Sequence, residues 1–216
     1  MDKILTTNEI IKTEKTKSSS VGLYTTIGIG SVALAFSIAA IPFVTPALRK
    51  HTLPYVPATD KQLDNVFKTI DFIRKSSKIS KPASSSTLID LGSGDGRIVF
   101  EASKRGYCAT GVELNFFLYL YSRFKALSFR SNPRPVFKRA NLWNVNLGNY
   151  DLIVLFGVQE MMKDLSVKLN KEIKQDTTIV TCRFPINDHK EIYSLEDGVD
   201  SVWVYDKNSL ENKIKN

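Results

Sequence analysis

The sequence predicts an α/β fold in which one doubly wound, Rossmann-like sheet follows a single apolar helix. Three features support this prediction: short apolar runs alternate with helical stretches, a glycine-rich loop follows the first of these runs, and an uncharged segment of 24 residues lies near the N-terminus. Alternating strands and helices are typical of a largely parallel sheet, so we expect helices on both of its faces.

The first 44 residues differ in character from the rest of the chain. Residues 1–20 are polar and are predicted to be disordered. Residues 21–44, VGLYTTIGIGSVALAFSIAAIPFV, contain no charge. As a helix they would reach about 36 Å, enough for a hydrocarbon core of ~30 Å. A cleaved secretory signal is the alternative, but the run is long and no A-x-A-like site follows it. We therefore expect a retained transmembrane helix that contacts lipid.

A proline-bracketed link leads to the first helix of the main domain, which Thr59 or Asp60 can cap. Residues 76–86, which contain six serines and one proline, are predicted to end this helix. Strands are expected near 87–91, 109–113, 135–139, 151–156, 177–182, 191–195 and 201–205, with helices near 96–104, 115–130 and 160–173. The last two strands are separated by only five residues, which predicts an antiparallel hairpin at the C-terminal edge of a seven-strand sheet.

These elements divide the chain into five segments: 1–20, the polar N-terminus; 21–44, the apolar helix; 45–80, a linker with a helix; 81–207, the α/β domain; and 208–216, a tail. The formal charge of +8 permits attraction to nucleic acid, anionic lipid or an acidic protein face and does not choose among them. The two cysteines, Cys108 and Cys182, are predicted to be buried in a reducing compartment. His189 is predicted to lie in a surface loop, and no metal site is expected.

The loop LIDLGSGDGR, residues 88–97, is the main candidate for a ligand site. It contains Asp90, Gly92, Ser93, Gly94 and Gly96. The glycines allow a tight turn and a close approach of ligand to backbone. Their spacing lacks the lysine and hydroxyl residue of a phosphate-binding loop, and Asp90 would repel a phosphate. A ligand with an ammonium and a sulfonium, such as S-adenosylmethionine, fits the acid better.

Two further strand ends complete the predicted site. GVELN places Glu113 at the end of the second strand, with Leu114 after it; a carboxylate there can accept both ribose hydroxyls, as it also does in dinucleotide sites. ANLW follows the third strand, where the Asn141 side chain could accept a hydrogen bond from the adenine amino group and Trp143 could pack against the ring. The order of acid, glycine loop and acid at successive strand ends favours an adenosyl ligand over a simple tight turn.

The motifs DLGSGDGR, GVELN and NLW resemble those of the class I, seven-strand S-adenosylmethionine-dependent methyltransferases. Over residues 40–207, the segments PFVTPALRK, LPYVPAT, FGVQEMM, CRFP and VDSVWVYD resemble, in order, the membrane-anchored mitochondrial protein-lysine methyltransferases. One branch of that family modifies the c subunit of ATP synthase and another the adenine nucleotide translocase. PFVTPALRK and LPYVPAT are closer to the c-subunit branch.

This resemblance implies the cofactor S-adenosylmethionine, an integral inner-membrane protein as substrate, and a single-pass location in the mitochondrial inner membrane. It assigns Asp90, Gly92 and Gly94 to the methionine end, Glu113 to the ribose and residues 141–143 to the adenine. The family usually has aspartate where this chain has Asn141, which still accepts a hydrogen bond. It tends to have proline where this chain has Gln159, which puts the shape of the substrate entrance in doubt.

Transfer to lysine requires a neutral amine aligned with the sulfonium methyl, and no covalent nucleophile is needed. Phe156, Gly157 and Glu160, at the end of the fourth strand, are the predicted rim of a lysine channel, although Glu160 could equally be a surface acid favoured by the helix dipole. Tyr55 and Thr59 are candidates to close over the cofactor, with simple linker packing as the alternative.

Residues 122–139 contain six basic residues and three phenylalanines and raise the possibility of RNA binding. Helical spacing favours the phenylalanines in the core and the charges in water, so a nucleic-acid partner is not favoured. Contact with anionic lipid is a further interpretation of the segment. An RNA methyltransferase and a membrane-tethered assembly factor without turnover remain the alternative functions.

Overall fold

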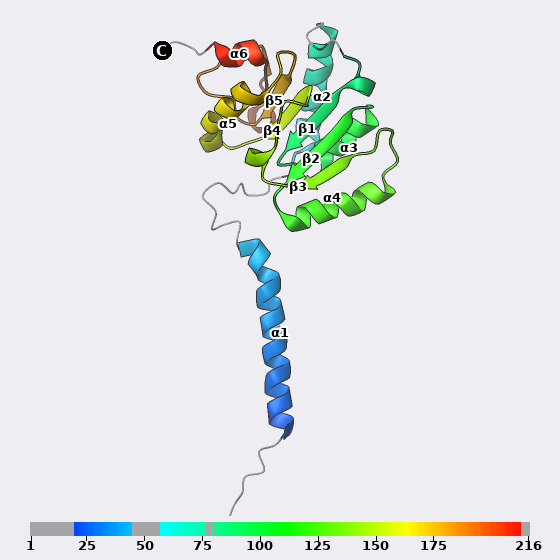
Figure 1. The fold of residues 1–216 in the computed structure, drawn as a ribbon, viewed down its shortest axis with the longest axis vertical. Coiled ribbons are helices and arrows are strands. Elements are labelled where there is room, and N and C mark those ends of the chain that lie inside the picture. The colour runs from blue at the N-terminus through cyan, green and yellow to red at the C-terminus, as the bar shows by residue number, and fades with distance from the viewer. Residues whose placement is uncertain (1–19, 45–56, 77–78, 80, 213–216) are drawn as a thin grey trace, which may run out of the picture. The chain divides into compact units, whose positions relative to one another are not determined.

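The computed structural model describes residues 20–44, 57–76, 79 and 81–212, which fall into two units, 1–44 and 45–216 (Figure 1). The described part of the first unit is the helix α1 (Ser20–Val44). Within the described part of the chain, no helix is both long enough and apolar enough to cross a membrane. The transmembrane helix predicted at 21–44 is therefore not confirmed, although a helix forms there.

The second unit contains a seven-stranded sheet of order β3-β2-β1-β4-β5-β7-β6. Its strands are β1 (Thr87–Leu91), β2 (Cys108–Glu113), β3 (Val136–Arg139), β4 (Leu152–Phe156), β5 (Thr178–Cys182), β6 (Tyr193–Leu195) and β7 (Val202–Tyr205). The first five strands are mutually parallel, and β7 runs antiparallel to both β5 and β6. The strand order reverses between β1 and β4, so the carboxyl ends of β1, β2 and β4 border the place where doubly wound sheets bind ligands.

Helices pack on both faces of the sheet (Figure 1). They are α2 (Asp60–Lys75), α3 (Arg97–Lys104), α4 (Phe116–Ser128), α5 (Gln159–Glu172) and α6 (Lys207–Glu211), with short 3₁₀ turns η3 (Ala83–Ser85), η4 (Leu142–Asn144) and η5 (Gly198–Asp200). Because side chains alternate along a strand, Leu88 belongs to the core under α2 and α3, whereas Ile89 belongs to the core under α5. The apolar strand runs thus serve two cores.

The predicted elements are confirmed, with every bound within two residues of the observed one. Thr59 caps α2 by accepting a hydrogen bond from the Gln62 N–H, as expected. The hairpin of β6 and β7 forms at the sheet edge. The α6 helix was not predicted, and it places part of the expected tail, 208–216, in a folded element.

Two predictions about single residues are wrong. Cys182 is buried, but Cys108 at the start of β2 is exposed. His189 is buried, and its Nδ1 lies 3.3 Å from the Ser209 carbonyl oxygen, so the ring belongs to the packing around α6 and not to a surface loop.

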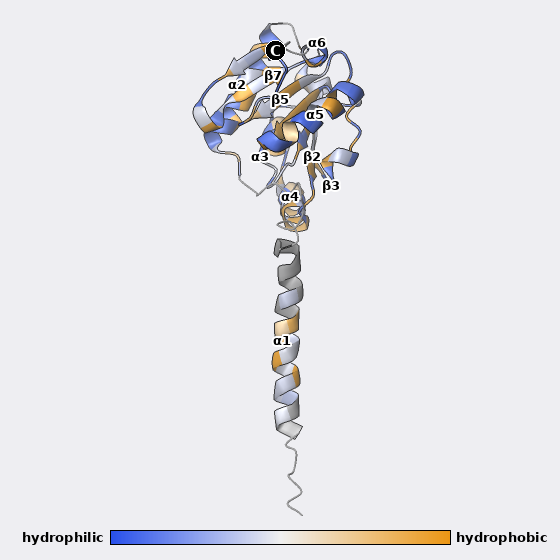
Figure 2. Cartoon of the chain, turned by 90° about the vertical axis from the view of Figure 1, so that its left-hand side faces the viewer, coloured by the Kyte–Doolittle hydropathy of each residue, from blue (hydrophilic) through white to orange (hydrophobic). Residues whose placement is uncertain are grey.

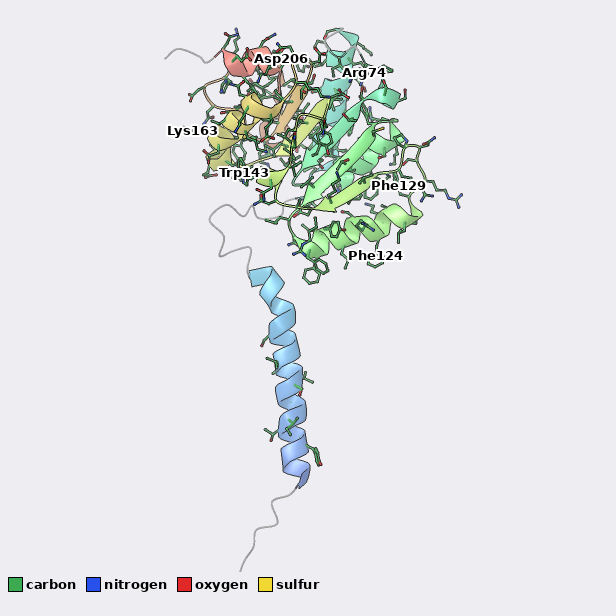
Figure 3. All side chains as sticks on the ribbon, in the orientation of Figure 1. Arg74, Phe124, Phe129, Trp143, Lys163 and Asp206 are labelled. Atoms are coloured by element: carbon green, nitrogen blue, oxygen red, sulfur yellow. The ribbon has the colours of Figure 1, made fainter. Side chains whose placement is uncertain are left out.

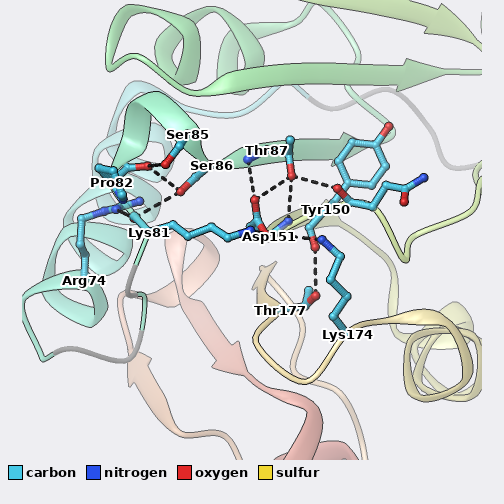
Figure 4. A network of polar contacts seen from close by, with 11 residues as sticks. Arg74, Lys81, Pro82, Ser85, Ser86, Thr87, Tyr150, Asp151, Lys174 and Thr177 are labelled. Atoms are coloured by element: carbon cyan, nitrogen blue, oxygen red, sulfur yellow. Dashed lines mark hydrogen bonds and ion pairs between the residues drawn. The ribbon is translucent and has the colours of Figure 1, made fainter.

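A buried carboxylate organises the amino end of the sheet (Figure 4). Asp151 accepts hydrogen bonds from the Thr87 N–H and Oγ1, each at 2.9 Å, and pairs with Lys81 Nζ at 2.7 Å. Burial acts to raise the pKa of Asp151, but the bonds from Lys81 and Thr87 outweigh it and lower the pKa to about 2. The ionised side chain therefore stabilises the start of β1 and β4.

Replacement of Asp151 by asparagine should lower the free energy of unfolding at pH 7 by about 1–2 kcal/mol. The folded pKa lies below the unfolded value of about 3.9, so this contribution is complete above pH ~5 and disappears as the pH falls toward 2. Urea unfolding at pH 7 and at pH 3 measures it. A difference between wild type and variant that stays constant over this range would contradict the assignment to ionised Asp151.

Candidate functional site

The loop between β1 and α3 turns sharply at the carboxyl end of β1. Gly92, Gly94 and Gly96 all have positive φ, at 84°, 52° and 82°. At Gly96, which precedes α3, a Cβ atom would also lie 2.7 Å from the Phe137 ring. At Gly92, by contrast, no atom of the described residues lies within 4 Å of such a Cβ. The loop therefore needs glycine for its conformation and leaves open space in front of the backbone at Gly92.

Glu113, at the end of β2, holds this loop in place. Its Oε2 accepts a hydrogen bond from the Gly94 N–H at 2.9 Å, and its Oε1 accepts one from the Asn115 N–H at 2.7 Å. Each carboxylate oxygen can accept a second bond, so Glu113 can still receive hydroxyl donors from a ligand. One side chain thus joins the glycine loop to the start of α4.

Asp90 is buried near the end of β1, with 3% of its surface exposed. Burial raises the pKa of this carboxyl to about 8, and the negative charges of Glu113 and Asp95 contribute in the same direction. The same surroundings raise the pKa of Cys182 on β5, first through burial and then through Asp90. A buried acid among other acids favours a cationic ligand, because a positive charge would restore its ionised form.

The third predicted segment lies beside the same edge. The Ala140 N–H donates to the Glu113 carbonyl at 3.1 Å, so the chain after β3 runs next to the end of β2. Asn141 follows and accepts from the Trp143 N–H at 3.1 Å, which forms the turn η4. Leu142 and Trp143 pack against the core under α5. The structure therefore brings 90–96, 113–114 and 141–143 to one edge of the sheet.

The predicted substrate rim lies at the carboxyl end of β4. Phe156 is partly buried, and Gly157 is buried against Met162, whose Cε would lie 2.5 Å from a Cβ at position 157. Glu160 is exposed in the first turn of α5. Met161 and Met162 are core residues.

Of the two residues predicted to close over the cofactor, Tyr55 and Thr59, the structure describes only Thr59. Tyr55 lies outside the described residues. Thr59 caps α2, and its hydroxyl also donates to Asp200 Oδ1 at 2.7 Å. These bonds anchor the start of α2 to η5, which agrees with the linker-packing alternative.

Arg183, the first residue after β5, has no role predicted from the sequence. It has a φ of 71°, rare for a residue with a side chain, and its guanidinium lies 6.0 Å from the centre of the Phe156 ring. Strained backbone is often found at functional sites, so Arg183 joins the candidate rim. The CRFP motif was the available signal, but a motif does not reveal a left-handed backbone.

The acids and open glycine backbone at this edge fit an adenosyl ligand with cationic groups better than they fit a phosphate. The strand order with its terminal antiparallel hairpin, together with this loop, defines a class I methyltransferase fold. An RNA methyltransferase from Salinibacter ruber, solved with S-adenosyl-L-homocysteine, shares the fold with a TM-score of 0.62 at 21% identity; the match covers 70% of this chain and 93% of that one.

Sequence comparisons identify the family within this fold class. The family model of the ANTKMT methyltransferase domain matches residues 90–192, and that of the N-terminal domain of the ATP synthase c-subunit lysine N-methyltransferase matches residues 17–49. The ATP synthase c-subunit lysine N-methyltransferase of Caenorhabditis elegans is 42% identical, over 83% of this chain and 93% of its own length. The human protein of that name is 39% identical, over 92% and 81%.

The adenine nucleotide translocase lysine N-methyltransferase of Mus musculus is 31% identical, over 82% of this chain and 74% of its own length. The chain therefore belongs to the family of ATP synthase c-subunit lysine N-methyltransferases. It is an S-adenosylmethionine-dependent methyltransferase, as its motifs imply.

Proposed function

We propose that this enzyme methylates a lysine of the c subunit of ATP synthase. The observation that supports this substrate is the combined match to both parts of the chain: the N-terminal model covers 17–49, and the 42% identity to the worm enzyme extends over 83% of the chain. The 31% identity to the translocase enzyme is lower over a similar share, so the translocase is the second candidate.

Different residues at the sheet edge would bind different parts of the cofactor. We assign the cofactor ammonium to Asp90, the ribose hydroxyls to Glu113 and the adenine to Asn141, Leu142 and Trp143, with Ser93 and Leu114 completing the pocket. The backbone at Gly92 and Gly94 would lie against the methionine end, while Gly96 sets the start of α3. Bound S-adenosylmethionine supplies an activated methyl group on a sulfonium.

The protein must then present a neutral lysine amine in line with that methyl group. Lysine has a pKa near 10.4 in water, and removal from water lowers it. We assign the channel to Phe156, Gly157 and Glu160, with Arg183 beside Phe156. An apolar ring next to the methyl donor desolvates the amine, and Glu160 at the mouth would attract the lysine before it loses its proton.

The test is mass spectrometry of mitochondrial membrane proteins from cells with and without the gene, rescued by wild type, Asp90→Asn or Asp176→Asn. Asp176 is an exposed aspartate between α5 and β5, at the far end of the sheet from the site, and serves as the control. Methylated c-subunit lysine should disappear without the gene and return with wild type and Asp176→Asn only. Loss on the translocase instead would reassign the substrate. Unchanged proteins with hypomethylated RNA would overturn lysine transfer.

We also propose that residues 21–44 attach the enzyme to the mitochondrial inner membrane by a single pass. The supporting observation is a continuous helix of 25 residues, Ser20–Val44, without a charged side chain. Moving a charged side chain from water into the hydrocarbon core is the largest energetic cost of insertion. A helix without charged side chains does not have this cost.

In mitochondria treated with alkaline carbonate, the wild-type protein should stay with the membrane pellet. The double substitution Ile29→Arg and Leu34→Arg should release it, since each arginine costs about 2.5–3.5 kcal/mol near the centre of a span. Val199→Arg, at an exposed position of η5, should leave it in the pellet. Retention of the double-arginine variant would count against a membrane span.

A further inference from the structure

The helix α4 is apolar on the side that faces solvent as well as on the side that faces the sheet. Its inner side contacts the core through Tyr119 and Ala126, and Ser122 there is fully buried. Its outer side exposes large apolar residues: Phe116 (41%), Phe117 (38%), Tyr121 (53%), Phe124 (64%) and Leu127 (71%). Figure 2 shows hydrophobic residues along α4, and Figure 3 shows Phe124 on the side away from the sheet. The expectation that the phenylalanines of 122–139 are all in the core is therefore wrong for Phe124.

The five exposed residues and the half-buried Leu120 form one continuous face. At 100° per residue, Phe116, Leu127, Leu120, Phe124, Phe117 and Tyr121 follow one another over an arc of about 140°. Arg123 borders this arc on one side and Lys125 on the other. A contiguous, exposed apolar face usually marks a contact with a partner.

The charge around the face has one sign. No acidic residue occurs from Leu114 to Tyr150, whereas this stretch contains six basic residues, Arg123, Lys125, Arg130, Arg134, Lys138 and Arg139. All six are exposed. The face is thus complementary to a surface that is apolar below and anionic above, as a bilayer with acidic headgroups is.

We propose that the outer face of α4 lies on an anionic membrane surface, with its apolar arc among the acyl chains and Arg123 and Lys125 at the headgroups. This contact goes beyond the proposed function and does not depend on residues 21–44. RNA would use stacking rings and cations but would leave Leu120 and Leu127 without a role. A helix with two apolar sides and cationic borders favours the lipid interface.

The position of α4 gives this contact a consequence for the site. Asn115 caps α4 immediately after Glu113, and the Ser122 hydroxyl donates to the Gly94 carbonyl at 3.1 Å. The inner side of α4 is thereby tied to the glycine loop. A membrane held by the outer side would lie beside the edge of the sheet that carries the site, within reach of a lysine close to the bilayer surface.

The test is a fluorescent bimane label on the full chain with Cys108→Ser, placed at Phe124→Cys or, in a second variant, at Leu127→Cys. Val167→Cys on α5 is the matched control, because Val167 is 66% exposed and Phe124 is 64% exposed. The protein is added to phosphatidylcholine vesicles with or without phosphatidylglycerol. Iodide quenches labels in water, and a nitroxide on the lipid chains quenches labels in the membrane.

At positions 124 and 127, we expect loss of iodide quenching and a gain of nitroxide quenching with phosphatidylglycerol vesicles, and no such change at 167. The double substitution Arg123→Ser and Lys125→Ser should restore the iodide quenching. Equal iodide quenching at 124 and 167 would overturn the proposal. Protection of the label from iodide without nitroxide quenching would also overturn the proposal. Such protection without lipid would indicate contact with a second copy of the chain, and protection on addition of RNA would indicate a nucleic-acid site. Protection on addition of the ATP synthase substrate in detergent would indicate a protein-docking site.

Discussion

Asparagine in place of Asp90 should abolish tight cofactor binding and, at the same time, stabilise the free protein. The carboxyl is buried beside Glu113 and Asp95, which raises its pKa to about 8. Truncating one member of a buried charge pair typically costs about 2–5 kcal/mol, so we expect S-adenosylmethionine to bind at least ~30-fold more weakly. The amide cannot ionise, and the free protein escapes the cost of a poorly solvated acid.

The stability gain has a definite pH dependence. The folded pKa of Asp90 is above its unfolded value of about 3.9, so the acid contributes nothing unfavourable below pH ~4 and an increasing penalty from there to pH 8. At pH 8 the asparagine variant should gain at least about 1 kcal/mol, or ~2–4 °C in Tm for a chain of this size. Thermal unfolding at pH 5 and pH 8 measures this difference.

Cofactor binding supplies the second readout. A cationic ligand favours the ionised form of Asp90, so binding to wild type should release a proton, and affinity should rise between pH 6 and 8 by up to about tenfold per unit. Calorimetry in buffers of different ionisation enthalpy should show the released proton with wild type and none with Asp90→Asn.

Asp151→Asn is the matched control at the opposite end of the sheet, because its buried acid has a lowered pKa and its loss should reduce stability. If both variants lowered Tm equally, or if Asp90→Asn bound cofactor as well as wild type, the assignment of Asp90 to the ligand cation would be wrong.

The fold was predictable because its determinants are local in sequence. β1, β4 and β5 are apolar runs bounded by turn residues, and Thr59 precedes the apolar period of α2, so pattern alone locates each element. The α6 helix follows a different rule. It has five residues, and a capping box between Asp206 and Ser209 holds its first turn, a contact too short-ranged to appear as periodicity. With α6 unpredicted, the burial of His189 could not be foreseen.

Some features of the candidate site were likewise predictable from the sequence, and others were not. Asp90 and Glu113 lie at the ends of β1 and β2, and Asn141 follows β3. Parallel strands bring their carboxyl ends to one edge, so the sequence predicted this juxtaposition. The left-handed backbone of Arg183 and the exposure of Phe124 depend on tertiary packing. Helical spacing shows which residues share a side of α4 but not which side packs against the sheet. Because α4 has apolar residues on both sides, the pattern does not reveal whether Phe124 is buried or exposed.

Glutamine in place of Glu113 should weaken cofactor binding by about 100-fold or more while the protein stays folded. The carboxylate accepts bonds from the N–H groups of Gly94 and Asn115, and glutamine must turn an NH₂ group toward one of these donors. Leaving a backbone donor without its acceptor costs about 1–3 kcal/mol, which loosens the glycine loop as well as removing an acceptor for the ribose.

Glu172→Gln is the control for the loss of a carboxylate that accepts a backbone hydrogen bond but does not contact the cofactor site. Glu172, the last residue of α5, also accepts from a backbone N–H, that of Leu147 at 3.2 Å, and pairs with Lys168 at 2.7 Å, but neither partner belongs to the glycine loop. Urea unfolding should show a loss of about 1–3 kcal/mol for both variants. Calorimetry with S-adenosylhomocysteine should show weaker binding for Glu113→Gln alone. Equal affinities in the two variants would mean that Glu113 only braces the loop, and the ribose acceptor would have to be sought elsewhere on this edge.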